Sequence, residues 1–241
     1  MNSVILCEGK SDAILLSYYL EKTAGWKFTK SIPDSLHIKQ RSSNDSLCWY
    51  QKGQDKLLIC SVGGKDNFGK YFKEQILHPM IRSNAFGKLA IVTDRDSRKI
   101  EEIESGLRKE VYPYISNLKN NDWTTSEYLD SFEIRNTIDC LLVVIPDDCE
   151  GALETVLLNA ISENPYDKNI VDRCRNFVKD IKPEAEKYIS SNRLRLKAEL
   201  SVTWAIQSPQ KVFDFIDEEI RSVKWENSAL LNRCFCKLVE I

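Results

Sequence analysis

Acidic side chains follow two apolar stretches of the sequence, at the point where each stretch ends. Glu8 comes directly after residues 4–7. Asp94 and Asp96 follow residues 89–93. Both stretches are predicted to be buried strands of a parallel sheet, and such sheets bind ligands outside the carboxyl ends of their strands. Carboxylates gathered there would repel one another, and a hard divalent cation such as Mg²⁺ would relieve the repulsion.

Each acid also has a purely structural interpretation. Asp12 suits the first turn of a helix, which it could cap alone or together with Ser11. Asp94 and Asp96 could form a turn of the ordinary Asx type. Taken singly these patterns are weak. Acids that follow two buried strands, with a strand–helix unit between them, favour the cation site over the structural interpretation.

Four short apolar stretches without strict alternation indicate strands that are buried on both faces. They cover residues 4–7, 57–62, 89–93 and 141–145. Helical periodicity separates them, over residues 11–22, 68–81 and 98–118. This alternation predicts an α/β fold with a mostly parallel four-stranded sheet that is flanked by helices.

Two segments interrupt the alternation of strands and helices. Residues 24–56 are predicted to form a long connection that ends in a hairpin, and residues 119–139 an exposed insertion. After Gly151 the pattern is largely helical to the last residue. We therefore expect a catalytic core of residues 1–165 that carries both insertions, and a helical C-terminal extension of residues 166–241 packed on the core.

Three stretches together resemble the TOPRIM domain, which topoisomerases, bacterial primases, small nucleases and OLD-type nucleases share. They are ILCEGKSD at residues 5–12, ICSVGGKD at residues 59–66 and IVTDRDS at residues 91–97. The first and last match the family's Glu-Gly strand end and its later Asp-x-Asp strand end. The middle one is similar to the small, OLD-like branch. The resemblance covers residues 3–97, extends toward residue 165, and implies a Rossmann-like TOPRIM core.

The resemblance also implies roles for the four acids. Glu8 would act as general acid or base, or as a metal ligand. Asp94 and Asp96 would bind Mg²⁺ or Mn²⁺. Asp12 would complete a second metal position, as in hydrolysis by two ions that clamp the attacking and leaving oxygens.

Further candidates lie in the second half of the chain. Glu150 and Glu154 are four residues apart, so they would share one face if a helix has begun by then. The segment from Gly151 to Glu154 is similar to the one that supplies a further metal-binding acid in OLD-like nucleases; an acidic helix N-terminus is the alternative. The nuclease branch also implies a lysine that steadies charge on the scissile phosphate, and Lys197 is the candidate.

A glycine pair at residues 63–64 precedes Lys65 at a predicted helix start. Gly63 and Gly64 could present N–H groups, and Lys65 a cation, to a phosphate. Gly9, which permits a tight turn after the first strand, is a further phosphate-binding candidate. A P-loop is excluded because GxxxxGK[ST] is absent. A turn that requires positive φ is the alternative interpretation.

Composition limits the class of protein. The chain has 241 residues and a net charge of −2, which excludes a strongly basic protein. Nucleic-acid affinity would then come from a metal or from a local patch, such as the acid-free stretch 187–197, which could equally be a solvated helix face. The sequence has no apolar run long enough for a membrane span, no secretory leader, and eight cysteines without a CxxC pair. These features predict a cytoplasmic protein without membrane contact.

The leading interpretation is a nuclease that hydrolyses DNA or RNA with one or two Mg²⁺ or Mn²⁺ ions. The sequence also resembles stand-alone TOPRIM proteins that are components of phage-defence systems, and some of these proteins pair with an ATPase. That ATPase would be a separate chain, because this sequence has no ATPase motif; a homodimer stays open. The alternatives are a non-catalytic or partner-activated TOPRIM subunit, a receiver-like phosphate-transfer domain, and a pure binding module.

Overall fold

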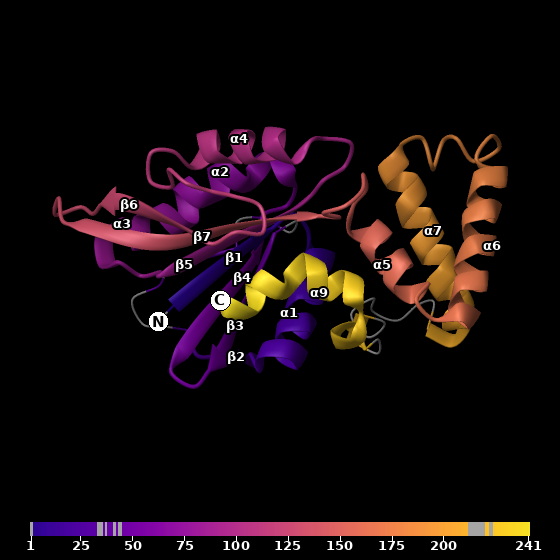
Figure 1. Ribbon diagram of the computed structural model, residues 1–241, viewed down its shortest axis with the longest axis horizontal. Helices are drawn as coiled ribbons and strands as arrows, with labels where there is room; N and C mark the ends of the chain where they lie inside the picture. Colours follow the sequence, from indigo (N-terminus) through magenta and orange to yellow (C-terminus); the bar gives the residue numbers. More distant parts are fainter. Residues whose placement is uncertain are drawn as a thin grey trace.

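A seven-stranded sheet forms the centre of the computed structural model (Figure 1). The structure describes residues 2–32, 36, 38–40, 42, 45–211, 220–221 and 224–241. In chain order the strands are β1 (Asn2–Cys7), β2 (Lys27–Thr29), β3 (Ser46–Lys52), β4 (Asp55–Ser61), β5 (Lys88–Asp94), β6 (Thr124–Leu129) and β7 (Arg135–Ile145). Across the sheet their order is β2-β3-β4-β1-β5-β7-β6.

The four central strands run parallel. β1 pairs with β4 on one side and with β5 on the other, and β5 pairs with β7. The four predicted apolar stretches lie in these strands, apart from Val62, which is one residue past the end of β4; an α/β fold with a mostly parallel sheet between helices is confirmed. Their side chains are buried on both faces: Ile5 and Cys7 of β1 belong to one core, and Val4 and Leu6 to the other.

The predicted number of four strands is wrong, because three further strands pair antiparallel at the two edges. They arise within the two segments that were expected to be insertions. Residues 24–56 hold β2 and β3, the latter in the expected hairpin with β4. Residues 119–139 hold β6 and the start of β7. The edge strands lack continuous apolar runs: β6 alternates between buried and exposed residues, and only Trp49 of β3 is buried.

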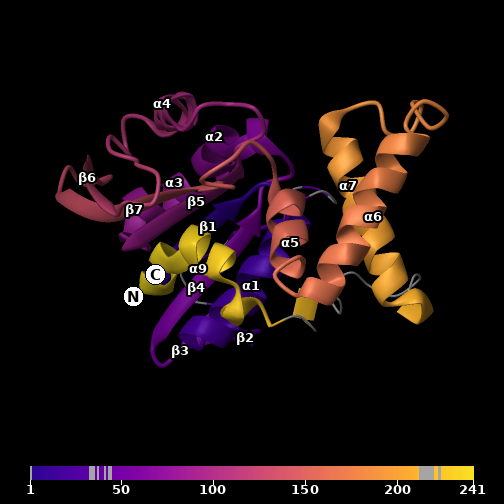
Figure 2. The ribbon, with the colours of Figure 1, turned by 45° about the vertical axis from the view of Figure 1, so that its right-hand side comes forward.

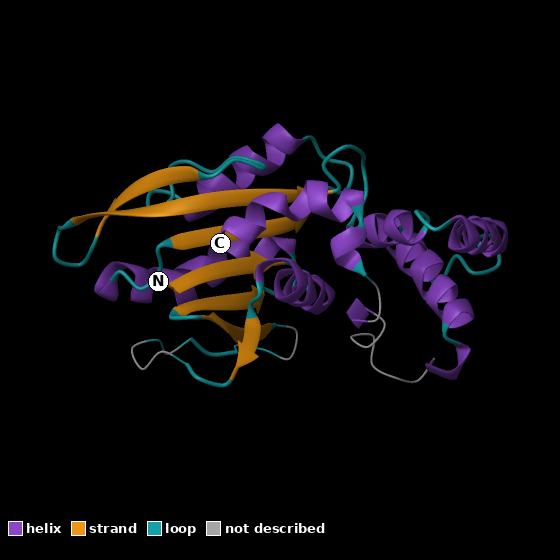
Figure 3. Ribbon diagram, turned by 60° about the horizontal axis from the view of Figure 1, so that its bottom comes forward, coloured by secondary structure: helices purple, strands orange, loops and turns teal. Residues whose placement is uncertain are grey.

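Helices cover both faces of the sheet (Figures 1 and 3). One face carries α1 (Lys10–Ala24) and α9 (Ala229–Phe235), which is followed by the 3₁₀ segment Cys236–Glu240. The other face carries α2 (Phe68–Tyr71), the π-helical turn Phe72–Ile76, α3 (Leu77–Ser83) and α4 (Ile100–Val111).

A pair of longer helices lies beyond the carboxyl ends of the central strands (Figures 1 and 2). After β7 the chain enters α5 (Leu153–Ile161) and then α6 (Pro165–Ile181) and α7 (Asn192–Gln207), which pack on each other and on α5. Two short 3₁₀ segments, Pro209–Lys211 and Trp225–Asn227, precede α9, which contacts α5 and β7. No helix in the described part of the chain has both the length and the apolar character needed to cross a membrane.

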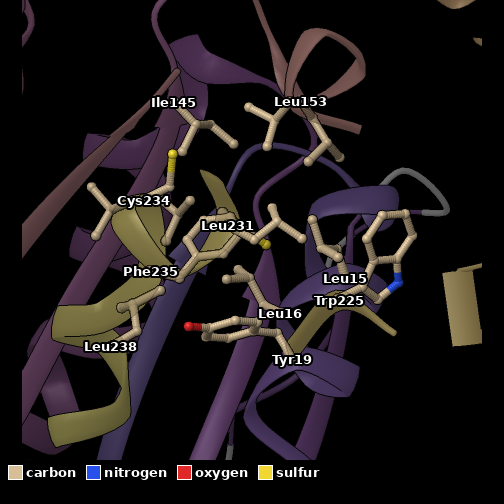
Figure 4. Close-up of a cluster of buried hydrophobic side chains, with 14 of the residues drawn as sticks. Leu15, Leu16, Tyr19, Ile145, Leu153, Trp225, Leu231, Cys234, Phe235 and Leu238 are labelled. Carbon is tan, nitrogen blue, oxygen red and sulfur yellow. The ribbon is translucent and has the colours of Figure 1, made fainter. Parts of the chain in front are cut away.

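The return of the C-terminal segment to the sheet rests on aromatic packing (Figure 4). Phe235 of α9 is fully buried, and its ring meets that of Tyr19 of α1 edge to face, with 5.3 Å between the centroids. Trp225 is also fully buried against this core. Residues more than two hundred positions apart in sequence therefore share one apolar cluster, which fixes both ends of the described chain to the same face.

We predict that Phe235→Ala lowers the free energy of unfolding by about 3–5 kcal/mol, because it removes a buried ring and leaves a cavity. The matched control is Phe132→Ala, since the Phe132 side chain is 74% exposed and its loss is expected to change stability by no more than about 0.5 kcal/mol. Urea unfolding monitored by circular dichroism measures both. Equal effects of the two substitutions would contradict the packing described here.

Candidate functional site

Glu8 links the ends of two central strands. It follows β1 directly, and its side chain is only 1% exposed. Its Oε1 accepts a hydrogen bond from the Thr93 hydroxyl at 2.7 Å and another from the Asp94 N–H at 3.0 Å, both at the end of β5. The structure thus brings Glu8 and Asp94 together, although 86 positions separate them in the sequence. Because β1 and β5 pair in parallel, their carboxyl ends, and with them both acids, lie side by side.

Asp12 lies beside this pair in the first turn of α1. Its Oδ2 accepts a hydrogen bond from the Gly9 N–H at 2.9 Å, so Asp12 does cap the helix, as its structural interpretation predicts. The side chain is nevertheless buried, and its charge is felt by Asp94 and Cys7. The capping role and a role in the acidic cluster are therefore compatible.

Two buried carboxylate oxygens of the cluster have no hydrogen-bond partner within the described residues. They are Oε2 of Glu8 and Oδ1 of Asp12. The Arg193 guanidinium comes within 3.9 Å of Glu8 Oε2, which is an ion-pair distance but too long for a hydrogen bond. A buried anionic oxygen without a donor is unfavourable unless a proton or a cation joins it.

Burial and repulsion from neighbouring carboxylates raise the pKa values of Asp12 and Asp94. Burial, and then the charge of Glu8, raise the pKa of Asp12 to about 7, although N–H groups of Gly9 and Asp12 itself lower it. Burial, followed by the charges of Asp12, Glu8 and Glu154, raises the pKa of Asp94 well above its usual range. The Leu153 N–H, which donates to Asp94 Oδ1 at 2.9 Å, opposes that shift. Asp12 and Asp94 therefore hold protons more tightly than isolated carboxylates do.

Asp96 lies apart from the buried acids, at the start of a tight turn after β5. Its φ of +53° is a left-handed conformation that Asp tolerates better than most residues. Its backbone N–H and carbonyl pair with those of Gly151 at 2.7 and 2.8 Å. Its Oδ2 accepts from Lys65 Nζ at 2.8 Å. The side chain of Asp96 is thus held by a lysine at the edge of the cluster.

The glycine pair shapes the turn that carries Lys65 to Asp96. The N–H groups of Gly63 and Gly64 donate to the carbonyl of Glu8 at 3.0 and 2.9 Å. Gly64 has a φ of +123°, a backbone conformation that residues other than glycine rarely adopt. These N–H groups are therefore not free for a phosphate, contrary to expectation, and the Gly9 N–H is likewise taken by Asp12. The alternative of a turn that requires positive φ is confirmed.

The acids between β7 and α5 separate from one another. Helix α5 begins only at Leu153, so the condition under which Glu150 and Glu154 would share a helical face is not met. Gly151, which lies between the two acids, has a non-helical φ of +148°. Any Cβ there would lie 2.4 Å from Thr155 Oγ1. Glu150 is exposed and lines a neighbouring cavity. Glu154 is 9% exposed, and its charge acts on Asp12 and Asp94.

Helix α7 brings two cations to the acids. Its N-terminus is capped by Ser191, whose hydroxyl accepts from the Leu194 N–H at 3.2 Å. Arg193 and Lys197, four residues apart and hence on one face, approach Glu8 Oε2 at 3.9 Å and Glu154 Oε1 at 3.1 Å. The sequence marked Lys197 but not Arg193. The signal for Arg193 was its place one helical turn before Lys197 in an acid-free stretch.

The donor chemistry of the cluster suits Mg²⁺ or Mn²⁺, since carboxylate oxygens are the ligands these hard cations prefer. The two buried oxygens without a partner fit a cation as well. However, within the described residues no three or more His, Cys, Asp or Glu side chains form a ready-made metal-ligand group. Protein donors now hold one oxygen each of Glu8, Asp94 and Asp96, so a bound ion would require these side chains to turn.

The fold and this site define an α/β protein with a buried carboxylate cluster at the ends of its central parallel strands. The chain belongs to a family described as "Protein of unknown function (DUF3226)", whose sequence model matches residues 2–229. It is similar in fold to the crystal structure of the hypothetical protein PH0156 from Pyrococcus horikoshii OT3. The two chains are 16% identical, with a TM-score of 0.54, over 99% of this chain and 98% of that one. No curated protein matches the chain.

The raised pKa of Asp12 predicts a pH-dependent stability in metal-free protein. A folded-state pKa of about 7, against 3.8 for the ordinary group, contributes stability that is complete below pH 3.8 and lost as the pH rises through 7. The side chain of the Asp12→Asn variant cannot ionise. The melting temperature of the variant minus that of the wild type should therefore increase between pH 5 and pH 8, by roughly 2–4 °C for each kcal/mol of stability that the wild type loses.

Thermal melts in EDTA across this pH range measure the effect. The matched control is Asp66→Asn, at an exposed acid outside the cluster. Its melting curve should follow the wild type at every pH. If the melting temperatures of Asp12→Asn and wild type stay parallel from pH 5 to pH 8, Asp12 does not titrate in a buried cluster.

Proposed function

We propose that the protein is a divalent-metal-dependent nuclease that hydrolyses phosphodiester bonds of DNA or RNA. One observation carries the proposal: Glu8, Asp12 and Asp94 are buried together at the strand ends, and two of their oxygens have no hydrogen-bond partner in the described structure. A proton or a cation must compensate these charges. The proximity of the Glu-Gly and Asp-x-Asp strand ends also supports the resemblance to TOPRIM domains of the OLD-like branch.

In this proposal Glu8, Asp12, Asp94 and Asp96 hold one or two Mg²⁺ or Mn²⁺ ions, and Glu154, whose charge acts on Asp12 and Asp94, is a further acid of the site. The metal would lower the pKa of a bound water and neutralise charge on the phosphate. In this proposal Glu8, whose Oε1 accepts hydrogen bonds from Thr93 and Asp94, would also take or return a proton beside the ligand acids.

Basic residues of the chain would serve the substrate phosphate. Lys65 and Lys197 now pair with Asp96 at 2.8 Å and with Glu154 at 3.1 Å. Both lysines are partly exposed, so each reaches the cluster from the solvent side. If a metal takes over the negative charge of these acids, the ammonium groups become available to a scissile phosphate, where they would stabilise developing charge.

A partner-activated subunit is the second candidate, and the same ion pairs favour it. Glu8, Asp96 and Glu154 each face a cation of the chain itself, namely Arg193, Lys65 and Lys197. Such a site is largely neutralised before any metal arrives. A separate ATPase subunit, or a second copy of the chain, could then be required to release it.

A reducing cytoplasm fits the proposal. All eight cysteines are free thiols in the structure, and five of them are buried. Free buried thiols are typical of compartments that do not favour disulfides. A nuclease of this kind would meet its nucleic-acid substrate in the same compartment.

We predict that Glu8→Gln and Asp94→Asn each lower Mn²⁺-dependent cleavage at least about 100-fold, equivalent to roughly 2.7 kcal/mol of transition-state stabilisation. Glu102→Gln, at an exposed acid of α4, is the matched control and should cleave as the wild type does. Nicking of plasmid DNA and hydrolysis of labelled RNA are the measurements, with circular dichroism to show that the variants are folded.

Cleavage that is equal in the wild type and in both cluster variants would overturn the nuclease proposal. Cleavage that appears only when a partner protein is added would select the partner-activated alternative. Labelling of the wild type by acetyl phosphate that is lost in Asp94→Asn would instead select the receiver-like phosphate-transfer domain.

A further inference from the structure

A polar cavity of about 530 Å³ lies next to the carboxylate cluster, between α6, α7 and the start of α5. Its lining includes Arg175 and Lys179 of α6 and Arg195 of α7, as well as backbone and side-chain groups around Gly151. Three cations from two helices therefore converge on one space. None of them belongs to the set of lysines and acids in the proposed nuclease site.

A buried acid fixes two of the cations. Glu199 is 2% exposed, and its carboxylate pairs with Arg195 Nη1 at 2.5 Å and with Arg175 Nε at 3.9 Å. Arg195 also donates to Asn192 Oδ1 at 2.6 Å, and Arg175 donates to Asn159 Oδ1 at 3.0 Å. The guanidinium groups are thus held in place before any ligand arrives, which reduces the entropy lost on binding.

Lys179 completes the basic wall and has no ion pair with any residue that the structure describes. It lies one helical turn after Arg175 on the same face of α6. Two acids, Glu150 and Glu199, also line the cavity. Since Glu199 is already engaged by the two arginines, the ammonium of Lys179 remains available to an anion that enters from solvent.

The cavity adjoins the carboxylate cluster through the backbone. Gly151 lines the cavity, and its N–H and carbonyl pair with those of Asp96 at 2.8 and 2.7 Å. Helix α7 serves both spaces: Arg193 and Lys197 face the acids, whereas Arg195 and Glu199 face the cavity. An extended anionic polymer could therefore place one phosphate at the acids and a neighbouring phosphate in the cavity.

We infer that this cavity binds a backbone phosphate of the nucleic-acid strand, next to the bond that the proposed site would cleave. This rests on the proposed function. Guanidinium forks and ammonium groups are the usual partners of phosphate oxygens. The lining is mostly charged and amide side chains and carries no aromatic ring on which a base could stack, so the contact holds the backbone and does not read the sequence.

The experiment measures binding of a fluorescent single-stranded oligonucleotide at several salt concentrations, in EDTA so that metal-dependent cleavage stops. Lys179→Ala should raise the dissociation constant about 3- to 10-fold and reduce the salt slope by about 0.7, the loss of one phosphate contact. The matched control is Arg173→Ala, which removes a charge from an exposed position on α6 outside the cavity and should leave both quantities unchanged.

Arg175→Lys supplies a second variant, which keeps the charge but loses the fork, and should also weaken binding. Equal binding by Lys179→Ala, Arg173→Ala and wild type would overturn the inference. If the wild type cleaves and Lys179→Ala binds normally, the nuclease proposal stands and the cavity assignment fails. If the wild type never cleaves yet binding depends on Lys179, the cavity is supported as a phosphate site and the nuclease proposal fails.

Discussion

The repulsion among buried carboxylates at the strand ends is the constraint on which the rest of the site depends. Glu8, Asp12 and Asp94 are at most 7% exposed; the charge of Glu8 raises the pKa of Asp12, and the charges of Asp12 and Glu8 raise the pKa of Asp94. Backbone hydrogen bonds offset part of this repulsion, since N–H groups of Gly9, Asp94 and Leu153 each donate to one carboxylate oxygen.

Helix α7 answers another part of the repulsion. Its Arg193 and Lys197 pair with Glu8 and Glu154, while Lys65, which follows β4, pairs with Asp96. The helical pair α6 and α7 is thus joined to the sheet by charge as well as by packing on α5. A metal ion bound to the acids would weaken these ion pairs. Binding of the ion and the position of α7 would therefore influence each other.

The sequence was informative where burial dictates a pattern. Continuous apolar runs identified the parallel strands, and the rule that ligand groups gather at the carboxyl ends of such strands was enough to expect Glu8 near Asp94. Of the edge strands, only β3 was anticipated, as part of a hairpin; β2 and β6 were missed because half-exposed strands lack such runs, as the alternating burial of β6 illustrates. The resemblance to TOPRIM domains stays a prediction, since family membership and fold similarity carry no activity.

The side chains whose positions depend on long-range geometry could not be placed from sequence. Glu150 diverges from Glu154 because Gly151 has a φ of +148° and the helix starts only after it. Arg193 reaches Glu8 because α7 folds back over the strand ends, across 185 positions of the chain. The N–H groups of Gly63 and Gly64 donate to the Glu8 carbonyl, and no local sequence pattern predicts these hydrogen bonds.

A crystal structure of the protein with Mn²⁺, located by its anomalous scattering, tests the central claim most directly. The account predicts an ion in direct contact with carboxylate oxygens of Glu8 and Asp94, with Lys65 released from Asp96. An anomalous map without a peak at these acids, with the ion pairs of Lys65 and Arg193 unchanged, would contradict it.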